Sequence, residues 1–562
     1  MTEELSVTTE RVDDIPLLLA HSDKMGVPQL LDEHFKPHGN WEGMSLGWTT
    51  AVWLAHILED ADHRLHTLHL CTGQQVGEQG WSDDRLAIVL DALADTDTWQ
   101  QFETALTGRV IRVYNLKPQR VRLDSTTTSG YWTVTEEGLF QFGESPDHRP
   151  DLPQLKVMLS ALDPLGLPIA TQIVSGQRAD DPLYLPAIAQ VSKSLDEHGL
   201  LYVGDCKMAA LETRAFLQAQ QDYYLCPLSS KQMPDDVLEG YLRPVWAGDQ
   251  ALTAVSREQE AGQVEVLAEG YEQAITLSSA VDGRMITWTE RHLIVRSHKL
   301  ATAATQALHA RLAKAQADLE GLNEHKQGKK RYVDGASLQQ ATQAIIKQHH
   351  VDGLLRVRIE EHVEERALRA YGNRSASMQV ERSLSLHTAV DEQAVEAAIR
   401  RFGWRVYATN QAKEVLSLQQ AVLAYREEYL VEHGFGRLKG KPLSLSPMYV
   451  QSDRRATGLV RLLSIGLRVL TRLQFRVRQR LADTQESLPG LYAGNPKRTT
   501  HRPTAEALLG AFKQIHLSTI TLGQQLHRHI TPLSMVQQHI SSLMDFSPGL
   551  YDRLCTEFPK PI

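Results

Sequence analysis

The chain has 562 residues, an apolar fraction of 42% and a formal net charge of −9. That length suffices for roughly three or four domains with buried cores. The acidic balance argues against nonspecific coating of nucleic acid, although one basic face could still bind it. Four widely spaced cysteines exclude a CxxC metal knuckle and a disulfide framework. No signal segment opens the chain and its most apolar run, Trp48 to Leu58, is too short for a membrane span, so we expect a cytoplasmic protein without a membrane partner.

The first part of the chain, residues 1–115, is predicted to be helical. Apolar residues recur at helical spacing over 17–20, 27–35, 45–59, 83–93 and 98–106. Ser82 before two acids, and Asp97 with Gln100 three residues later, are typical helix starts. This N-terminal domain could be a compact bundle or a DNA-reading helix-turn-helix. The scarcity of basic residues favours the bundle.

Near residue 119 the pattern changes to short apolar strands and intervening helices. The strand 120–123 delivers Asp124, and the apolar strand 200–204 ends on Asp205. The other expected elements are strands 155–162, 169–174 and 223–226, and helices 182–194 and 209–218. Three strands, helix, strand, helix, strand is the order of an RNase H-like core, predicted over 116–230. Aspartates at the ends of buried strands are held rigidly, as metal chemistry requires.

An insertion with strands and helices is predicted over residues 231–402. Alternating runs at 285–296 and 354–360 indicate strands, and the long stretch 299–322 carries one apolar helical stripe. Trp288, in the first alternating run, could stack on an unpaired or flipped base or pack in the interior of the insertion. The core is expected to resume with strand 405–409 and to extend over 403–445.

The segment YREEYLVEHGFGRLK, from Tyr425 to Lys439, is predicted to be a helix. In a continuous helix Tyr425, Glu428 and Glu432 would share a face, at i+3 and i+4 steps. Taken alone, Glu432 would be a solvated helix residue. After two strand-end aspartates and an insertion, Glu432 becomes the candidate for a third metal ligand.

Basic residues are concentrated towards the C-terminus. From residue 437 to residue 502 there are 14 Lys and Arg against 3 acids. The arginines at helical spacing are Arg468, Arg472, Arg476 and Arg480, with leucines on the other face. A basic helical C-terminal region is therefore predicted over 446–562. Its arginine face could lie along a phosphate backbone or simply be solvated.

Four segments together resemble the DDE transposases of bacterial insertion sequences, in the group with a β-rich insertion before the catalytic Glu. They are LDSTTTSGYW from Leu123, HRPDLPQLKVMLSALDPLGLPI from His148, YVGDCKMAA from Tyr202 and YREEYLVEHGFGRLKG from Tyr425. The resemblance covers most of the chain, including the helical front and the segment HRPTAEALLGAF near the end. It implies an α/β protein with an interrupted RNase H-like catalytic core.

The resemblance also implies roles for individual residues. Asp124, Asp205 and Glu432 match the three catalytic acids, while Tyr425 and Lys439 match the signature Tyr-x2-Arg-x3-Glu-x6-Lys. At one position the chain departs from the signature: Glu428 stands where the family carries Arg, and Arg426 comes two residues early. Glu428 would repel a phosphate or act as an extra acid near the metal site.

Carboxylates without histidine or cysteine favour a hard cation, so two Mg²⁺ ions are expected, which Mn²⁺ may replace. Such a pair, about 3.5–4 Å apart, activates a water or a 3′-hydroxyl and stabilises the leaving oxygen. Asp124 would bridge both ions, with Asp205 and Glu432 each holding one. The expected function is cleavage and strand transfer at the ends of an insertion sequence. Two alternatives remain: a catalytically impaired, DNA-binding descendant, and an RNase H-like nuclease without strand transfer.

The expected partners are the terminal inverted repeats of the element and its target DNA, bound by a homodimer at the bacterial nucleoid. Lys439 could contact a phosphate or serve as a helix-end cation. His148 and Lys156 could face DNA, although core or surface roles are favoured. The full set of predicted DNA contacts is Tyr425, Lys439, Arg437, Arg468, Arg472, Arg476 and Trp288.

Overall fold

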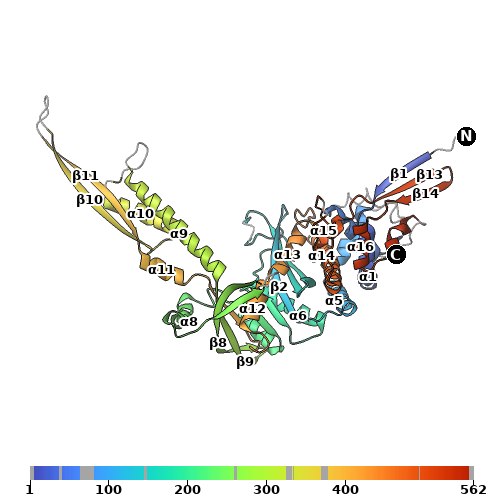
Figure 1. Cartoon of the computed structure of the whole chain (residues 1–562), viewed down its shortest axis with the longest axis horizontal. Helices are drawn as coiled ribbons and strands as arrows, with labels where there is room; N and C mark the ends of the chain where they lie inside the picture. The colour runs from blue at the N-terminus through green and yellow to red at the C-terminus, as the bar shows by residue number, and fades with distance from the viewer. Residues whose placement is uncertain are drawn as a thin grey trace.

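The protein is a mixed α/β molecule with a large central sheet, a helical lobe on one side and a narrow arm on the other (Figure 1). The computed structural model describes residues 5–36, 39, 41–63, 82–144, 149–258, 263–324, 332, 334–368, 377–492, 494–495 and 497–555. Both ends of the chain lie at the helical lobe (Figure 1). Among the described residues, no helix combines the length and the apolar character needed to cross a membrane.

The central sheet has nine strands in the order β4-β3-β2-β5-β6-β12-β9-β8-β7. Strands β2, β3 and β4 form an antiparallel meander, and β5 runs parallel to both β2 and β6. Their bounds are β2 (Arg120–Ser129), β3 (Gln154–Leu162), β4 (Leu167–Ser175), β5 (Leu201–Gly204), β6 (Tyr223–Pro227), β7 (Thr253–Glu258), β8 (Val264–Val281), β9 (Arg284–Ser297) and β12 (Trp404–Thr409). All the strands predicted between residues 116 and 230 therefore form, in the predicted chain order.

The predicted insertion is partly continuous with this sheet. Strand β12 pairs with β6 on one side and with β9 on the other, so β9, β8 and β7 extend the same sheet. Helix α12 (Leu418–Arg426) covers part of one face, where Ala421 and Val422 belong to a buried cluster with Leu201, Val203 and Leu225. Helix α6 (Tyr184–Leu195) packs on β3 and β4, helix α7 (Leu211–Ala219) contacts β6 and β8, and helix α8 (Asp235–Ala247) precedes β7.

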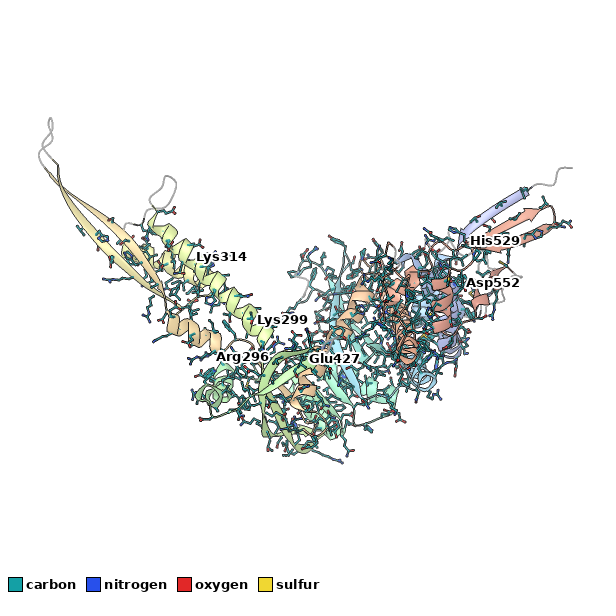
Figure 2. The ribbon with its side chains drawn as sticks, viewed as in Figure 1. Arg296, Lys299, Lys314, Glu427, His529 and Asp552 are labelled. Carbon is teal, nitrogen blue, oxygen red and sulfur yellow. The ribbon has the colours of Figure 1, made fainter. Side chains whose placement is uncertain are left out.

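The remainder of the insertion forms the arm. It contains α9 (His298–Glu320), α10 (Gly335–Gln348), β10 (Leu355–Leu368), β11 (Ser377–Val390) and α11 (Glu392–Arg400). Its small core is built on the predicted stripe of α9, where Leu308, Leu312 and Leu319 are buried. Lys299 and Lys314 mark the course of α9 away from the sheet (Figure 2).

The helical lobe combines the two ends of the chain in one hydrophobic core. Its helices are α1 (Ile15–Met25), α2 (Val27–His34), α3 (Leu46–Asp60), α4 (Asp83–Leu93), α5 (Thr96–Tyr114), α14 (Asp453–Thr484), α15 (Ala505–Gly510) and α16 (Met535–Leu543). Helix α14 packs closely on α4, since a Cβ at Gly458 would come within 2.0 Å of the Leu90 carbonyl oxygen. The stretches 1–115 and 446–562 are thus separate in sequence but joined in packing.

Two details of these regions correct the sequence analysis. Helix α5 begins after Asp95, whose carboxylate accepts a hydrogen bond from the backbone N–H of Thr98, so the predicted start at Asp97 is wrong. The predicted Ser82 cap of α4 is confirmed.

The C-terminal region is not entirely helical, because β1 (Leu5–Arg11), β13 (His516–Leu522) and β14 (Gln525–Ile530) form a small sheet. Strand β1 pairs with a strand some 500 residues away, a contact that no local pattern reveals.

The predicted DNA-binding arginines of α14 are mostly inside the lobe. Arg468 and Arg472 are only 2% and 1% exposed. Arg468 forms an ion pair with Glu103 of α5 and donates to Ser464 Oγ at 2.9 Å, while the Arg472 guanidinium lies over the Tyr114 ring. The predicted DNA contacts of Arg468 and Arg472 are therefore wrong for this structure. These arginines, expected on an exposed face of α14, are instead buried against α5, which is far away in sequence.

Farther along α14, Arg476 and Arg480 both contact the carboxylate of Asp545, at 2.5 Å and 2.6 Å. The pKa of Asp545 is lowered to about 2 by its hydrogen bonds from Arg480 and Arg476, which outweigh the opposing effect of burial. Arg476, predicted to bind DNA, is thus occupied by an acid of the same lobe. Its DNA contact would require exchange of that partner.

The Arg468–Glu103 pair yields a stability prediction. Removing one partner leaves the other charge buried and unpaired, so Arg468→Ala should lower the free energy of unfolding by about 3–5 kcal/mol. Arg480→Ala is the matched control on the same helix, because the Arg480 side chain is 43% exposed, and it should cost less than about 1 kcal/mol. Urea unfolding followed by circular dichroism measures both changes. Equal midpoints for the two variants would contradict a structural role for Arg468.

Candidate active site

The segment 425–439 is broken into two helices, which corrects the prediction of one continuous helix. Helix α12 ends at Arg426 and α13 (Tyr429–Lys439) begins at Tyr429. Arg122 of β2 holds the end of α12, since its Nη2 donates to the Ala424 carbonyl oxygen at 2.7 Å. Arg120 Nη1 donates to Glu427 Oε2 at 3.0 Å. The two β2 arginines therefore fix the turn between the helices, an interaction that helical spacing cannot predict.

Arg122 is itself fixed by a carboxylate. Its Nε and Nη2 donate to the two oxygens of Asp163, each at 2.7 Å, and its side chain is 2% exposed. A paired, planar guanidinium of this kind has a defined orientation. Glu427, which Arg120 contacts, lies in the central part of the molecule near the sheet (Figure 2). The turn is consequently tied to β2 and to the start of the β3–β4 connection.

Asp124 lies two residues beyond Arg122 on β2, and so on the same face of the sheet. The sequence predicted Asp124 at a strand end, but β2 continues to Ser129 because it stays paired with β3. The parallel pairing with β5 does end here, at the Leu123–Gly204 register pair. Asp124 and Asp205 each follow one member of that pair, which brings two residues remote in sequence to adjacent positions.

Asp205 is oriented by two hydrogen bonds. The Tyr184 hydroxyl donates to Asp205 Oδ1 at 2.6 Å, and the backbone N–H of Lys207 donates to the same oxygen at 2.9 Å. Gly204 makes room for this contact, because a Cβ there would stand 3.2 Å from the Tyr184 ring and 2.8 Å from Met208 Sδ. Burial and the neighbouring charge of Asp205 raise the pKa of Tyr184, which keeps its hydroxyl proton available for donation.

The charges of Glu428 and Glu432 reach the two aspartates. Burial raises the pKa of Asp124 to about 7, assisted by the negative charges of Asp205, Glu428 and Glu432 and opposed by the hydrogen bond from Ser125 N–H. Burial also raises the pKa of Glu428, again with contributions from Glu432 and Asp205 and against a hydrogen bond from Tyr425. The charges of Asp205, Glu432 and Glu428, the last of which departs from the family signature, therefore all act on Asp124.

These four acids form an electrostatic group but not a closed ligand cage. Within the described ranges, no three Asp, Glu, His or Cys side chains are arranged closely enough to hold a metal ion. Glu432 is exposed in the first turn of α13, while Asp124, Asp205 and Glu428 are partly buried. Their oxygen donors are of the type that Mg²⁺ prefers. Coordination would require side-chain rotations, for which the exposed Glu432 has the most freedom.

Three predicted DNA contacts lie in the interior. Tyr425 is 8% exposed and packs on the Tyr407 ring, with centroids 4.9 Å apart. Trp288 is 5% exposed and donates through Nε1 to the Tyr224 hydroxyl at 2.9 Å, so interior packing, the alternative to base stacking, is confirmed. Arg437 is 4% exposed and pairs with Glu506 at 2.6 Å. Burial makes the predicted DNA contacts of all three wrong for this structure.

The remaining candidates have different outcomes. Lys156 is buried, and its Nζ donates to the Arg178 carbonyl at 2.6 Å and to Asp180 at 2.8 Å, so its favoured core role is confirmed. Asp180 also accepts from Ser125 Oγ at 3.2 Å, beside Asp124. The sequence analysis missed Asp180, together with Tyr184. Lys439, partly buried at the end of α13, stays a predicted phosphate contact, and His148 lies outside the described residues.

Comparison with known proteins found structural similarity without a sequence match. No family model matches the chain, and no curated protein matches its sequence. Among solved structures, it is similar to a piggyBac transposase in a synaptic complex with hairpin DNA, determined by cryo-electron microscopy. The identity is 9% and the TM-score is 0.24, over 83% of this chain and 84% of the transposase chain.

The raised pKa of Asp124 gives a pH-dependent prediction. The folded chain retains a proton on Asp124 up to about pH 7, whereas the ordinary pKa is 3.8, so the contribution of this group to stability falls as the pH rises between those values. Asp124→Asn removes the ionisation. In metal-free buffer the variant should match the wild type near pH 4 and be more stable by about 2–4 kcal/mol at pH 8. Urea midpoints at the two pH values measure the difference, and a variant no more stable at pH 8 would contradict it.

Proposed function

We propose that the protein is a DDE transposase that cleaves and joins DNA at the ends of an insertion sequence. The observation that carries this proposal is the grouping of Asp124, Asp205 and Glu432, the three acids designated by the family resemblance. They come from a strand, a strand end and a helix that are far apart in sequence. A purely structural set of acids would gain nothing from being brought together, since like charges repel.

The sheet supports an RNase H-like core as part of this proposal. Strands β4, β3 and β2 are antiparallel, and β5 and β6 follow in parallel after one helix each. Under the proposal, residues 116–230 and 403–445 make up the core and residues 231–402 the insertion. The break between α12 and α13 then serves to place Glu432 beside β2, while α12 itself packs against β7 and β8.

The proposed cofactors are two Mg²⁺ ions, with Mn²⁺ as a substitute. The residues fit such ions chemically, because all four grouped side chains are carboxylates and their mutual repulsion contributes to the raised pKa of Asp124. Asp124, Asp205 and Glu432 would hold the ions, and Glu428 would supply a fourth carboxylate. Bound Mg²⁺ would supply activation of a water or 3′-hydroxyl and stabilisation of the leaving oxygen.

The other residues of the site hold the four acids in position. Tyr184 and the Lys207 N–H fix one oxygen of Asp205, and the Ser125 N–H fixes one oxygen of Asp124. Arg120 and Arg122 hold the turn that precedes α13, and with it the positions of Glu428 and Glu432. Such supporting contacts keep ligands within the narrow range of positions that metal-assisted phosphoryl chemistry tolerates.

A cleavage assay tests the proposal. We expect Asp124→Asn, Asp205→Asn and Glu432→Gln each to reduce Mg²⁺-dependent cutting of DNA that carries the terminal inverted repeats by about a thousandfold or more, because each removes a metal ligand. DNA binding should be retained. Glu396→Gln is the charge-matched control, since Glu396 lies on α11 in the arm with its side chain 68% exposed, and it should retain cutting.

The outcomes of the assay separate the candidate functions. Cutting followed by joining supports a transposase, and cutting without joining supports an RNase H-like nuclease. DNA binding without any cutting supports a catalytically impaired descendant, for which the acid at position 428 is the favouring observation. Undiminished cutting in any one of the three acid variants would overturn the assignment of the site. The terminal repeats, target DNA and a homodimer on paired ends remain the proposed partners.

A further inference from the structure

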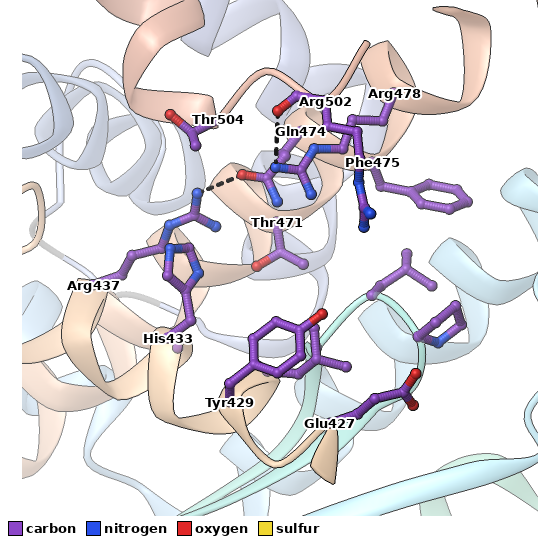
Figure 3. Close-up of a pocket in the computed structure, with 15 residues that line it drawn as sticks. Glu427, Tyr429, His433, Arg437, Thr471, Gln474, Phe475, Arg478, Arg502 and Thr504 are labelled. Carbon is purple, nitrogen blue, oxygen red and sulfur yellow. Dashed lines mark hydrogen bonds between the residues drawn. The ribbon is translucent and has the colours of Figure 1, made fainter. Parts of the chain in front are cut away.

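A cavity of about 530 Å³ lies between α13, α14 and the β3–β4 turn, and none of the grouped acids lines it (Figure 3). Its volume is within the range of roughly 300–1,000 Å³ usual for ligand sites. Tyr429 and His433 line it from α13, Phe475 and Arg478 from α14, and Arg502 from the segment before α15. Tyr429 and His433 stand on the α13 side of the cavity, and Arg478 and Arg502 on the opposite side (Figure 3).

Positive charge is in excess around this cavity. Three arginines and one acid, Glu427, line it. Arg437 pairs with Glu506 at 2.6 Å, and Glu427 pairs with Arg120, which lies outside the lining. Arg478 Nε donates to the Pro503 carbonyl at 2.8 Å, and within the described part of the chain neither Arg478 nor the exposed Arg502 forms an ion pair with a carboxylate. Burial, with the charges of Arg502 and Arg437, lowers the pKa of Arg478. This clustering of like charge is unfavourable by itself and would be relieved by a bound anion.

A second cavity, of about 510 Å³, continues along α14 and shares Phe475, Arg478 and Arg502 with the first. The two cationic side chains therefore stand between two adjoining spaces. A single phosphate or small anion would occupy only the position between them. A polymer in which anionic groups alternate with bulkier units would fit better. One anionic group would lie between Arg478 and Arg502, and the two neighbouring units would fill the two cavities.

Aromatic side chains border the same spaces. The Tyr429 side chain is 51% exposed, and Phe475 is partly buried where the two cavities meet. Exposed aromatic rings next to arginines are the usual means by which proteins bind single-stranded nucleic acid, because every base has a face that can stack. Tyr429 is also in the first turn of α13, three residues before Glu432.

We propose that these two cavities bind a single-stranded segment of DNA, with one backbone phosphate between Arg478 and Arg502 and the adjoining nucleotides in the two spaces. A base in the first cavity stacks on Tyr429. The inference rests on the proposed function in one respect, that DNA is the substrate. It adds a strand-binding site on the face of α13 that carries His433, next to the face that carries Glu432.

The test measures binding of a fluorescein-labelled 12-nucleotide oligothymidine to the full chain by anisotropy, in EDTA so that no cutting occurs. We expect Arg502→Gln to weaken binding about tenfold and to reduce the slope of log affinity against log salt by about 0.7, the value for one phosphate contact on a single strand. Tyr429→Ala should also weaken binding about tenfold, and Tyr429→Phe should restore it, because stacking needs only the ring. Arg243→Gln, at an arginine 73% exposed on α8, is the charge-matched control and should have no effect.

Wild-type affinity in both Arg502→Gln and Tyr429→Ala would overturn the inference. An equal loss for Arg502→Gln on a 12-base-pair duplex would also overturn it, by assigning a general backbone contact. Because binding is measured without metal, the inference and the proposed function fail separately. If binding depends on Arg502 but no Mg²⁺-dependent cutting occurs, the strand-site inference stands and the proposed transposase function fails. If cutting requires Asp124 but binding is unchanged by the Arg502 and Tyr429 substitutions, the transposase proposal stands and the strand-site inference fails.

Discussion

The contact between Arg122 and the end of α12 is the constraint on which the candidate site depends. Arg122 is held by both oxygens of Asp163 and donates to the Ala424 carbonyl, so β2 determines where α12 stops. The same strand carries Asp124 two residues later. One strand thus supplies an acid and also fixes the turn from which two further acids project. A continuous helix would place Glu428 and Glu432 by its own geometry, without reference to β2.

The packing of the helical lobe also determines which basic residues are available to a ligand. Counted along the sequence, the region after residue 437 has a large excess of Arg and Lys, which suggests one extended DNA-binding face. In the folded protein Arg468 and Arg472 join the two ends of the chain within one core. Buried arginines cannot serve a phosphate backbone. Beside α13, positive charge without a carboxylate partner is found at Arg478 and Arg502.

The sequence predicted the elements of the core well, because its strands are apolar and its helices strongly periodic. Asp124, Asp205 and Glu432 stay a predicted set of metal ligands, and the charges of Asp205 and Glu432 act on Asp124. The errors at Arg468, in the C-terminal region and in the segment 425–439 share one physical cause: the partner is remote in sequence. Glu103 buries Arg468, β13 pairs with β1, and Arg122 interrupts the helix. Likewise, Tyr184 and Asp180 belong to the surroundings of the acids only through tertiary packing. No local signal could have identified them.

The proposed function requires that Asp124, Asp205, Glu428 and Glu432 form a divalent cation site, and titration with Mn²⁺ measures that binding. Electron paramagnetic resonance of free Mn²⁺, titrated against the full chain, counts the ions taken up and needs no DNA. We predict uptake of about two ions by the wild type, loss of most of that uptake in Asp124→Asn, and wild-type uptake in Glu396→Gln, an exposed acid of the arm. Undiminished Mn²⁺ uptake by Asp124→Asn would contradict the assignment.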